Sequence, residues 1–133
     1  MTSNPTARRW AEMRRAEFVD ALASNPVVIV PVGSIEQHGP HCPVDVDVSI
    51  PTFIADQAST LVRDFPLIVA PTVPFGFTHY NQGFPGTITL QLETFISLVS
   101  EVCAGIHRNG FHRIILLNGH GGNHHPIRAI ATN

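Results

Sequence analysis

One short stretch of the chain, GSIEQHGPHCPVDVD at residues 33–47, gathers three acids and two histidines directly after an apolar run. Glu36 and His38 are two residues apart, so they point to the same side if the chain is still extended there. Asp47 returns after a Gly-Pro-His-Cys-Pro turn. Two carboxylates and an imidazole suit a divalent ion such as zinc, manganese or iron. The stretch alone leaves a second interpretation open, in which both acids are solvated and Asp47 helps to cap the following helix.

A second motif, NGHGGN at residues 118–123, follows another apolar run. Its glycines allow the backbone to approach a ligand closely, and the helix behind it offers free N–H groups to an anion or oxyanion. A histidine in this turn, His120, would lie near the first loop. The alternatives are a glycine-rich helix start with a chance histidine, or a phosphate cradle. The motif matches neither the P-loop nor the dinucleotide-binding pattern.

The elements that must position these residues follow from the apolar pattern. Buried strands are predicted at residues 27–31, 66–73 and 112–118. Helices are predicted from a cap at Thr6 to about Ser24, from Ser49 or Pro51 to Arg63, over residues 92–110, and after a cap at Asn123. Strands that alternate with helices indicate a mainly parallel sheet covered on both faces. The loops 33–47, 74–88 and 118–123 would then lie at the carboxyl ends of the strands, where such sheets place their sites.

The predicted second helix has an apolar face of its own. Its members recur at helical spacing: Ile50, Phe53, Ile54, Ala58 and Leu61.

Composition restricts the function classes. The 133 residues suit one domain spanning 1–133, and 44% of them are apolar. A net charge of −2 gives no general attraction to nucleic acid, and no apolar run approaches the ~18 residues of a membrane span. The first residues lack the apolar core of a signal peptide, and two cysteines make no disulfide framework, so a cytoplasmic protein is expected. Only 14% of residues are charged, against a usual share of roughly 25%, which indicates a surface partly covered by other subunits or by further sequence.

Three segments together resemble the creatininase family: PVGSIEQHGPHCPVDVD, GFPGTITL and LLNGHGGN, in this order and spacing. Members of that family are metal-dependent hydrolases that act on cyclic amides, formamides and some peptide bonds. The resemblance implies a three-layer α/β/α sandwich, a site for two divalent ions (Zn, Mn or Fe), a small-molecule amide substrate and a homo-oligomer, often a hexamer.

Carried over by position, the resemblance makes Glu36, His38, Asp47 and His120 metal ligands. Asp47 would bridge the two ions, with Glu36 and His120 on one and His38 on the other. Asp47 and His120 are therefore the predicted catalytic residues.

Further residues receive smaller roles. Asp45 is interpreted as a surface acid, and His41 as a group that supports the loop or contacts substrate. From the turn itself, rather than from the resemblance, we predict that backbone N–H groups near Gly121, Gly122 and Asn123 stabilise an oxyanion.

The sequence departs from the family pattern at one ligand. Creatininase proper has a glutamate for the second metal two residues after the turn histidine, where this chain has Gly122. Relatives with the NGHGGN motif supply a later glutamate instead, so the domain is predicted to be truncated on its C-terminal side.

The predicted function is metal-dependent hydrolysis of a non-peptide C–N bond, in a cyclic amide or formamide, by a metal-activated water. The alternative is a truncated, inactive member that serves as a metal-binding or assembly subunit. A phosphate- or nucleotide-binding domain ranks last, because it leaves the acids and histidines of the first loop unexplained.

Overall fold

The protein is built on a parallel sheet of three strands with the order β2-β1-β3. Its structure is a computed structural model that describes residues 8–132. The strands are β1 (Val27–Val32), β2 (Leu67–Val69) and β3 (Arg113–Asn118). Val27 pairs with Leu67 on one side and with Arg113 on the other. The parallel sheet predicted from the alternating pattern is confirmed.

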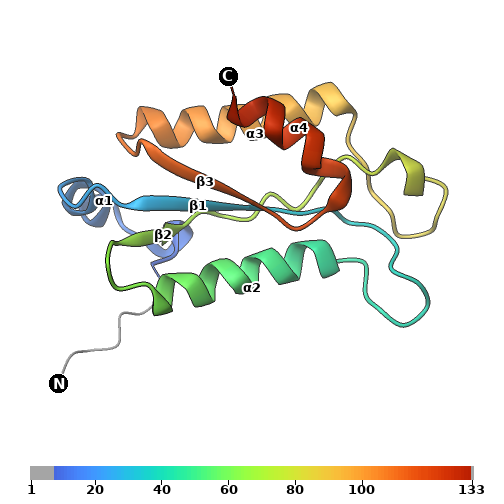
Figure 1. Ribbon diagram of the computed structural model, residues 1–133, viewed down its shortest axis with the longest axis horizontal. Helices are drawn as coiled ribbons and strands as arrows, with labels where there is room; N and C mark the ends of the chain where they lie inside the picture. The colour runs from blue at the N-terminus through green and yellow to red at the C-terminus, as the bar shows by residue number, and fades with distance from the viewer. Residues whose placement is uncertain (1–7, 133) are drawn as a thin grey trace.

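Helices cover both faces of this sheet (Figure 1). Helix α2 (Val46–Leu61) lies on one face, whereas α3 (Leu92–Arg108) and α4 (His124–Ala131) lie on the other. Helix α1 (Arg15–Leu22) precedes β1, and the 3-10 turns are η1 (Trp10–Glu12), η2 (His79–Asn81) and η3 (Gly121–Asn123). The expected three-layer α/β/α fold is therefore present.

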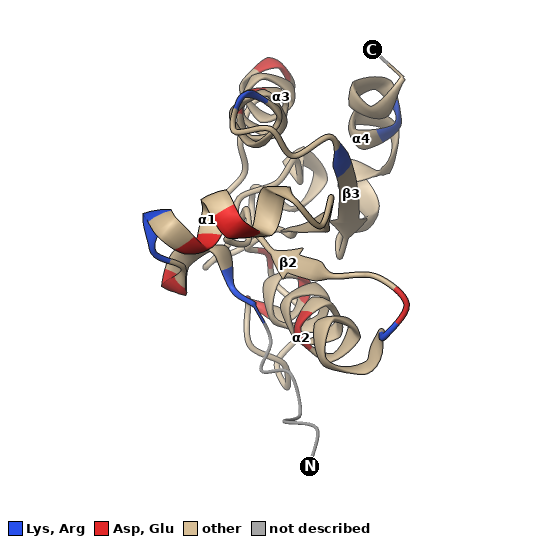
Figure 2. Cartoon of the chain, turned by 90° about the vertical axis from the view of Figure 1, so that its left-hand side faces the viewer, with Lys and Arg blue, Asp and Glu red and all other residues tan. Residues whose placement is uncertain are grey.

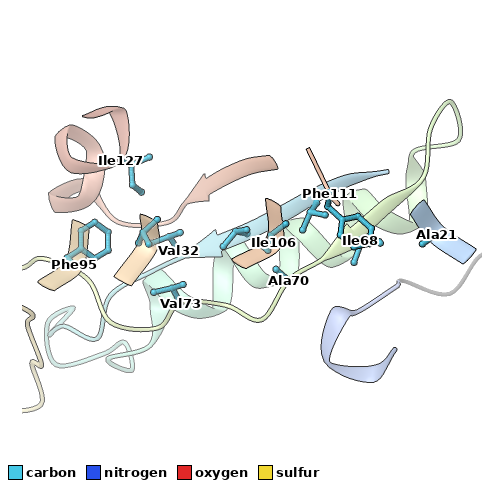
Figure 3. Close-up of a cluster of buried hydrophobic side chains, with 12 residues drawn as sticks. Ala21, Val32, Ile68, Ala70, Val73, Phe95, Ile106, Phe111 and Ile127 are labelled. Atoms are coloured by element: carbon cyan, nitrogen blue, oxygen red, sulfur yellow. The ribbon is translucent and has the colours of Figure 1, made fainter. Parts of the chain in front are cut away.

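Strand β1 is buried along its whole length and separates two apolar cores. Because successive side chains alternate between faces, Val28, Val30 and Val32 pack toward α3 and α4. Phe95 from α3 and Ile127 from α4 meet them there (Figure 3). On the opposite face Val27 and Ile29 pack with Ala55 of α2. Each fully buried side chain of this kind contributes about 1.5–3 kcal/mol, so the cores hold the layers in place.

Strand β2 is shorter than the predicted 66–73 and ends at Val69. Pro71 lacks a backbone N–H and so interrupts the ladder. The segment nevertheless continues beside β1, since Ala70 N donates to Ile29 O at 2.8 Å and Val73 N donates to Pro31 O at 2.9 Å. This path leads the following loop to the carboxyl end of β1.

Helix α2 begins at Val46, earlier than the predicted Ser49 or Pro51, so Asp47 lies inside its first turn. A proline is common at the start of a helix, but Pro51 here is an interior residue. The apolar residues at helical spacing do not form the buried face of α2, because the helix buries the face that carries Asp47, Pro51, Ala55 and Ser59. Four of those apolar residues are exposed: Ile50 by 53%, Phe53 by 64%, Ile54 by 48% and Leu61 by 70%.

Two helix starts also differ from prediction. Helix α1 begins at Arg15, after η1, while the predicted cap Thr6 lies outside the described residues. Arg14 N donates to the Glu17 carboxylate at 2.9 Å, which closes the first turn of α1. Asn123 does precede α4, but its side chain makes no capping hydrogen bond.

The outer surface is sparsely charged. In the view of Figure 2, acidic and basic segments are interspersed and no face of a single sign stands out. Strand β3 lies at an edge of the described sheet, and Ile115 on it is 48% exposed. None of the helices within residues 8–132 has the length and apolar character that crossing a membrane requires.

Candidate metal centre at the sheet edge

Three loops meet at one end of the sheet, on the right in Figure 1: the loop after β1, the 74–90 loop and the turn after β3. Helix α2 follows β1 on one face and helix α4 follows β3 on the other, so the connections diverge at the carboxyl ends of β1 and β3. Such a divergence opens a crevice in which open α/β sheets bind ligands. The predicted site residues come from these loops.

Two glycines let the first turn of α2 reach this end of the sheet. A Cβ atom on Gly33, after β1, would lie 2.9 Å from Val48 Cα. A Cβ atom on Gly119, after β3, would lie 2.7 Å from Pro51 Cδ. Real side chains do not tolerate such separations, so glycine at both strand ends is what brings Asp47 between the strands.

Asp47 is at the centre of the polar cluster. Its Oδ2 atom lies 2.7 Å from His120 Nδ1, and its Oδ1 atom lies 3.2 Å from His38 Nε2. Glu36 Oε1 is 3.3 Å from the same His120 nitrogen. The possible ligand atoms of Glu36, His38 and Asp47 all lie within 4.8 Å of one another. The structure thus brings the four predicted metal ligands together, while their role as ligands stays a prediction.

The orientation of both histidines follows from backbone carbonyls. His38 Nδ1 lies 3.1 Å from Glu36 O, and His120 Nε2 lies 3.2 Å from Phe77 O. A carbonyl oxygen only accepts, so each of these nitrogens carries the proton. The other nitrogen of each ring then faces an Asp47 oxygen, a contact that takes either a second proton on the ring or a bound cation between the two atoms. Metal-binding histidines are oriented by carbonyls in this way. The donor set therefore fits a divalent ion.

The cluster is buried: the exposed fraction is 7% for Glu36, 9% for Asp47 and 2% for His120. Burial raises the pKa of Asp47 despite the opposing effect of His120. Burial also acts to raise the pKa of Glu36, but hydrogen bonds from Thr78 and Asn81 outweigh it, and that pKa lies below its usual value. The pKa of His38 is raised, chiefly by its hydrogen bond to Glu36 O. Negative charge held out of water in this way favours a cation.

The 74–90 loop contributes further polar groups to the cluster. Thr78, fully buried, donates its hydroxyl to Glu36 Oε2, and Asn81 Nδ2 donates to the same oxygen at 2.8 Å. Tyr80 stacks on the His120 ring with centroids 6.2 Å apart, and its hydroxyl is 3.4 Å from Nε2. Burial, followed by the charge of Glu36, raises the pKa of Tyr80, so its hydroxyl keeps its proton near neutral pH. Thr78 is a single polar residue in an aromatic loop and has no periodic signal, so the sequence did not point to it.

The remaining predicted residues lie around the cluster. His41 is exposed in the turn between His38 and Cys42, and within residues 8–132 it makes no hydrogen bond or ion pair with the four predicted ligands. Gly121 has open space at its Cβ position, whereas a Cβ on Gly122 would lie 2.6 Å from His120 Nε2. Gly122 therefore allows the His120 ring its position.

Asn123 has a different role from the one predicted. Its backbone N–H donates to His120 O at 3.2 Å, so the oxyanion prediction narrows to Gly121 and Gly122. Its fully buried side chain donates to Gly33 O and accepts from Phe77 N, both at 2.9 Å. Asn123 thereby ties together all three loops that carry the cluster.

The chain resembles enzymes with different substrates. The mycofactocin precursor peptide peptidase of Mycolicibacterium smegmatis is 39% identical over 113 residues, which cover 80% of this chain and 43% of that protein. The 3-dehydro-scyllo-inosose hydrolase of Thermotoga maritima is 35% identical over 118 residues, which cover 88% of this chain and 37% of that protein. The chain thus spans less than half the length of these relatives.

Solved structures share the fold. A crystal structure of creatinine amidohydrolase matches with a TM-score of 0.88 at 27% identity, over 96% of this chain and 51% of that one. Two further matches at 27% identity, with TM-scores of 0.87 and 0.86, are described as a manganese creatininase and a Zn–Zn type creatininase variant; they cover 95% and 96% of this chain and 50% and 51% of theirs. The family model for creatininase (creatinine amidohydrolase) matches residues 11–133. With this match added to the shared fold, the chain belongs to the creatininase family.

Proposed function

We propose that this chain carries the metal-binding half of an amidohydrolase site that cleaves a C–N bond with a metal-activated water. The observation that carries the proposal is the placement of Asp47, whose two carboxylate oxygens each face a histidine nitrogen, at 2.7 and 3.2 Å. A carboxylate placed in this way suits a bridge between two ions. Family membership supports the reaction class.

The proposed ligands form two sets, one for each ion. Glu36, Asp47 and His120 would hold one ion, and Asp47 with His38 would hold the second. A bound divalent ion lowers the pKa of water toward about 7 and polarises a carbonyl oxygen. Asp47 fixes both positions, and Tyr80 presents a protonated hydroxyl beside His120. Backbone N–H groups at Gly121 and Gly122 would face the oxyanion.

The two proposed ion positions differ in the number of side chains that could bind the ion. Three of the described side chains serve the first ion, whereas two serve the second, and structural zinc sites usually have four ligands. We expect this chain to bind one ion well. Zinc, manganese and iron accept these ligands, and the solved creatininases include a manganese and a Zn–Zn form.

The favoured substrate is a cyclic amide or formamide, as the sequence motifs suggest. A peptide bond is the second candidate, favoured by the 39% identity to a precursor peptide peptidase. Parallel assays on creatinine, an N-formyl compound and a peptide would separate these substrates. A metal-binding or assembly subunit without turnover is the other candidate, and the weaker second ion position favours it.

We also propose that the protein is cytoplasmic and forms a homo-oligomer, for which a hexamer is the expected size. Support for assembly comes from the exposed apolar side chains of α2, Ile50, Ile54 and Leu61, together with Ile115 on β3. Light scattering after size-exclusion chromatography should give a mass above one chain, and Ile54→Glu should lower it. A monomer at all concentrations would contradict assembly.

The test of the site compares metal content and turnover in matched variants. Glu36→Gln and His120→Ala should each lose the tightly bound ion and the activity. Glu93→Gln is the control, because Glu93 is exposed on α3. Unchanged metal content in Glu36→Gln and His120→Ala would rule out the assignment, and two tightly bound ions in the wild type would refute the difference between the positions.

A further inference from the structure

The carboxylate of Glu36 is held asymmetrically. Its Oε2 atom accepts two hydrogen bonds from the 74–90 loop, one from the Thr78 hydroxyl and one from Asn81 Nδ2 at 2.8 Å. Its Oε1 atom instead faces His120 Nδ1 at 3.3 Å. The two oxygens of one carboxylate therefore have different surroundings, one within the loop and one within the metal cluster.

The two donors leave little further capacity on Oε2. Each oxygen of an ionised carboxylate offers about two lone-pair sites, and Thr78 and Asn81 occupy both on Oε2. A metal ion placed among Asp47, His120 and Glu36 would accordingly meet Oε1. Hydrogen bonds to a charged acceptor are stronger than neutral ones, so the ion would not easily displace them.

The loop that provides these donors is itself fixed. Thr78 is fully buried, and its backbone N–H donates to Thr89 Oγ1 at 2.9 Å. The preceding residue, Phe77, donates its N–H to the buried Asn123 side chain, also at 2.9 Å. The donors on Glu36 are thus anchored both within their own loop and to the turn that carries His120.

We infer that Thr78 and Asn81 are positioning residues that restrict Glu36 to coordinating through Oε1 alone. The inference rests on the proposed metal site and adds what the loop does for it. A carboxylate that uses one oxygen leaves a coordination position open, which a hydrolytic metal site needs for water or substrate. Without the clamp, Glu36 could rotate and coordinate through both oxygens.

The experiment measures Co²⁺ binding to the purified chain, by calorimetry and by the visible absorption of the bound ion. Thr78→Val removes the hydroxyl at nearly constant volume, and Thr78→Ser restores it. Thr72→Val is a matched control, because the Thr72 hydroxyl bonds to Thr52 at 2.7 Å and not to Glu36. Asn81→Leu removes the second donor and supplies an independent variant should Thr78→Val fail to fold, as judged by circular dichroism.

We expect Thr78→Val or Asn81→Leu to weaken Co²⁺ binding about 10- to 100-fold, as is usual when a partner of a metal ligand is lost. The absorption per bound ion should also fall, because these bands lose intensity as the coordination number rises. Thr78→Ser and Thr72→Val should match the wild type. Wild-type affinity and spectrum in both clamp variants would overturn the inference while leaving the metal site intact. A wild-type chain that binds neither Co²⁺, Zn²⁺ nor Mn²⁺ would overturn the proposed site and the clamp together.

Discussion

Asp47 and His120 are 73 residues apart in sequence, yet Asp47 Oδ2 lies 2.7 Å from His120 Nδ1. The contact joins the first turn of α2 to the turn that follows β3. It exists because β1 and β3 are neighbours, so that the loops leaving them meet at one end of the sheet. The contact therefore depends on the order of the strands, and it joins two of the proposed metal ligands.

The first prediction concerns Asp47→Asn. Replacing the carboxylate that is proposed to bridge the ions should weaken metal binding by more than the roughly 10- to 100-fold that follows loss of an outer partner. Without metal the substitution should leave the free energy of unfolding unchanged or raise it. Burial raises the pKa of Asp47, so the folded chain holds that proton more tightly than the unfolded chain and the ionised group opposes folding near neutral pH.

Thermal unfolding of wild type and Asp47→Asn, with and without Zn²⁺, checks whether the substitution is unfavourable only when metal is bound. Asp45→Asn is the matched control, because Asp45 immediately precedes α2 but is exposed and bonds to Ser49. Equal stabilisation of Asp47→Asn and wild type by Zn²⁺ would contradict the assigned role.

The second prediction compares two adjacent glycines. A methyl group on Gly122 would press against His120 Nε2, while one on Gly121 would meet open space. Gly122→Ala should cost about 1–3 kcal/mol of unfolding free energy through overpacking and should weaken metal binding by displacing the imidazole. Gly121→Ala should stay within about 0.5 kcal/mol of wild type. Urea unfolding and metal titration of the pair measure both effects, and equal behaviour of the two variants would refute the packing argument.

The sequence was sufficient for the sheet because its strands carry the strongest signal. The run from Val27 is β-branched and apolar throughout, and this predicts a strand buried on both faces. The start and the buried face of helix α2 were harder to predict. Pro51 resembles a helix start, and Ile50, Phe53 and Ile54 resemble a core-facing stripe. Burial is decided by which residue fits against the sheet, and the small Ala55 fits there.

The candidate site also contains residues that the sequence could predict and residues that it could not. Glu36, His38, Asp47 and His120 belong to motifs with fixed spacing, so their meeting could be predicted. Thr78 could not, since a single threonine in an aromatic loop has neither spacing nor periodicity. Its importance comes from a contact across 42 residues, to Glu36, that exists only in the folded chain.

The third prediction tests the core. Phe95 is fully buried between α3 and the sheet, whereas Phe53 on α2 is 64% exposed. Phe95→Ala should lower the free energy of unfolding by about 3–5 kcal/mol, because it removes buried contacts and leaves a cavity. Phe53→Ala should change it by less than about 0.5 kcal/mol in the single chain. Chemical denaturation at low protein concentration gives both values. A large loss for Phe53→Ala would show that α2 is covered in solution.

The fourth prediction is a pH dependence at the start of α1. Glu17 accepts hydrogen bonds from the backbone N–H and the guanidinium of Arg14, both at 2.9 Å. The backbone bond, followed by the side-chain bond, lowers the pKa of Glu17 below 4.5. Because the folded-state pKa is depressed, the stabilisation is fully present above the unfolded-state pKa of about 4.5 and is lost as pH falls through the folded value.

Glu17→Gln removes the charge but keeps a side-chain acceptor. The thermal midpoint of the wild type should therefore exceed that of the variant at pH 6–7, and the gap should shrink as the solution is acidified below pH 4.5. Glu12→Gln is the control, since Glu12 is exposed and its carboxylate pairs with the Arg9 guanidinium rather than with Arg14. A gap between wild type and Glu17→Gln that stays constant down to pH 3 would mean that the carboxylate charge of Glu17 does not contribute to the start of the helix.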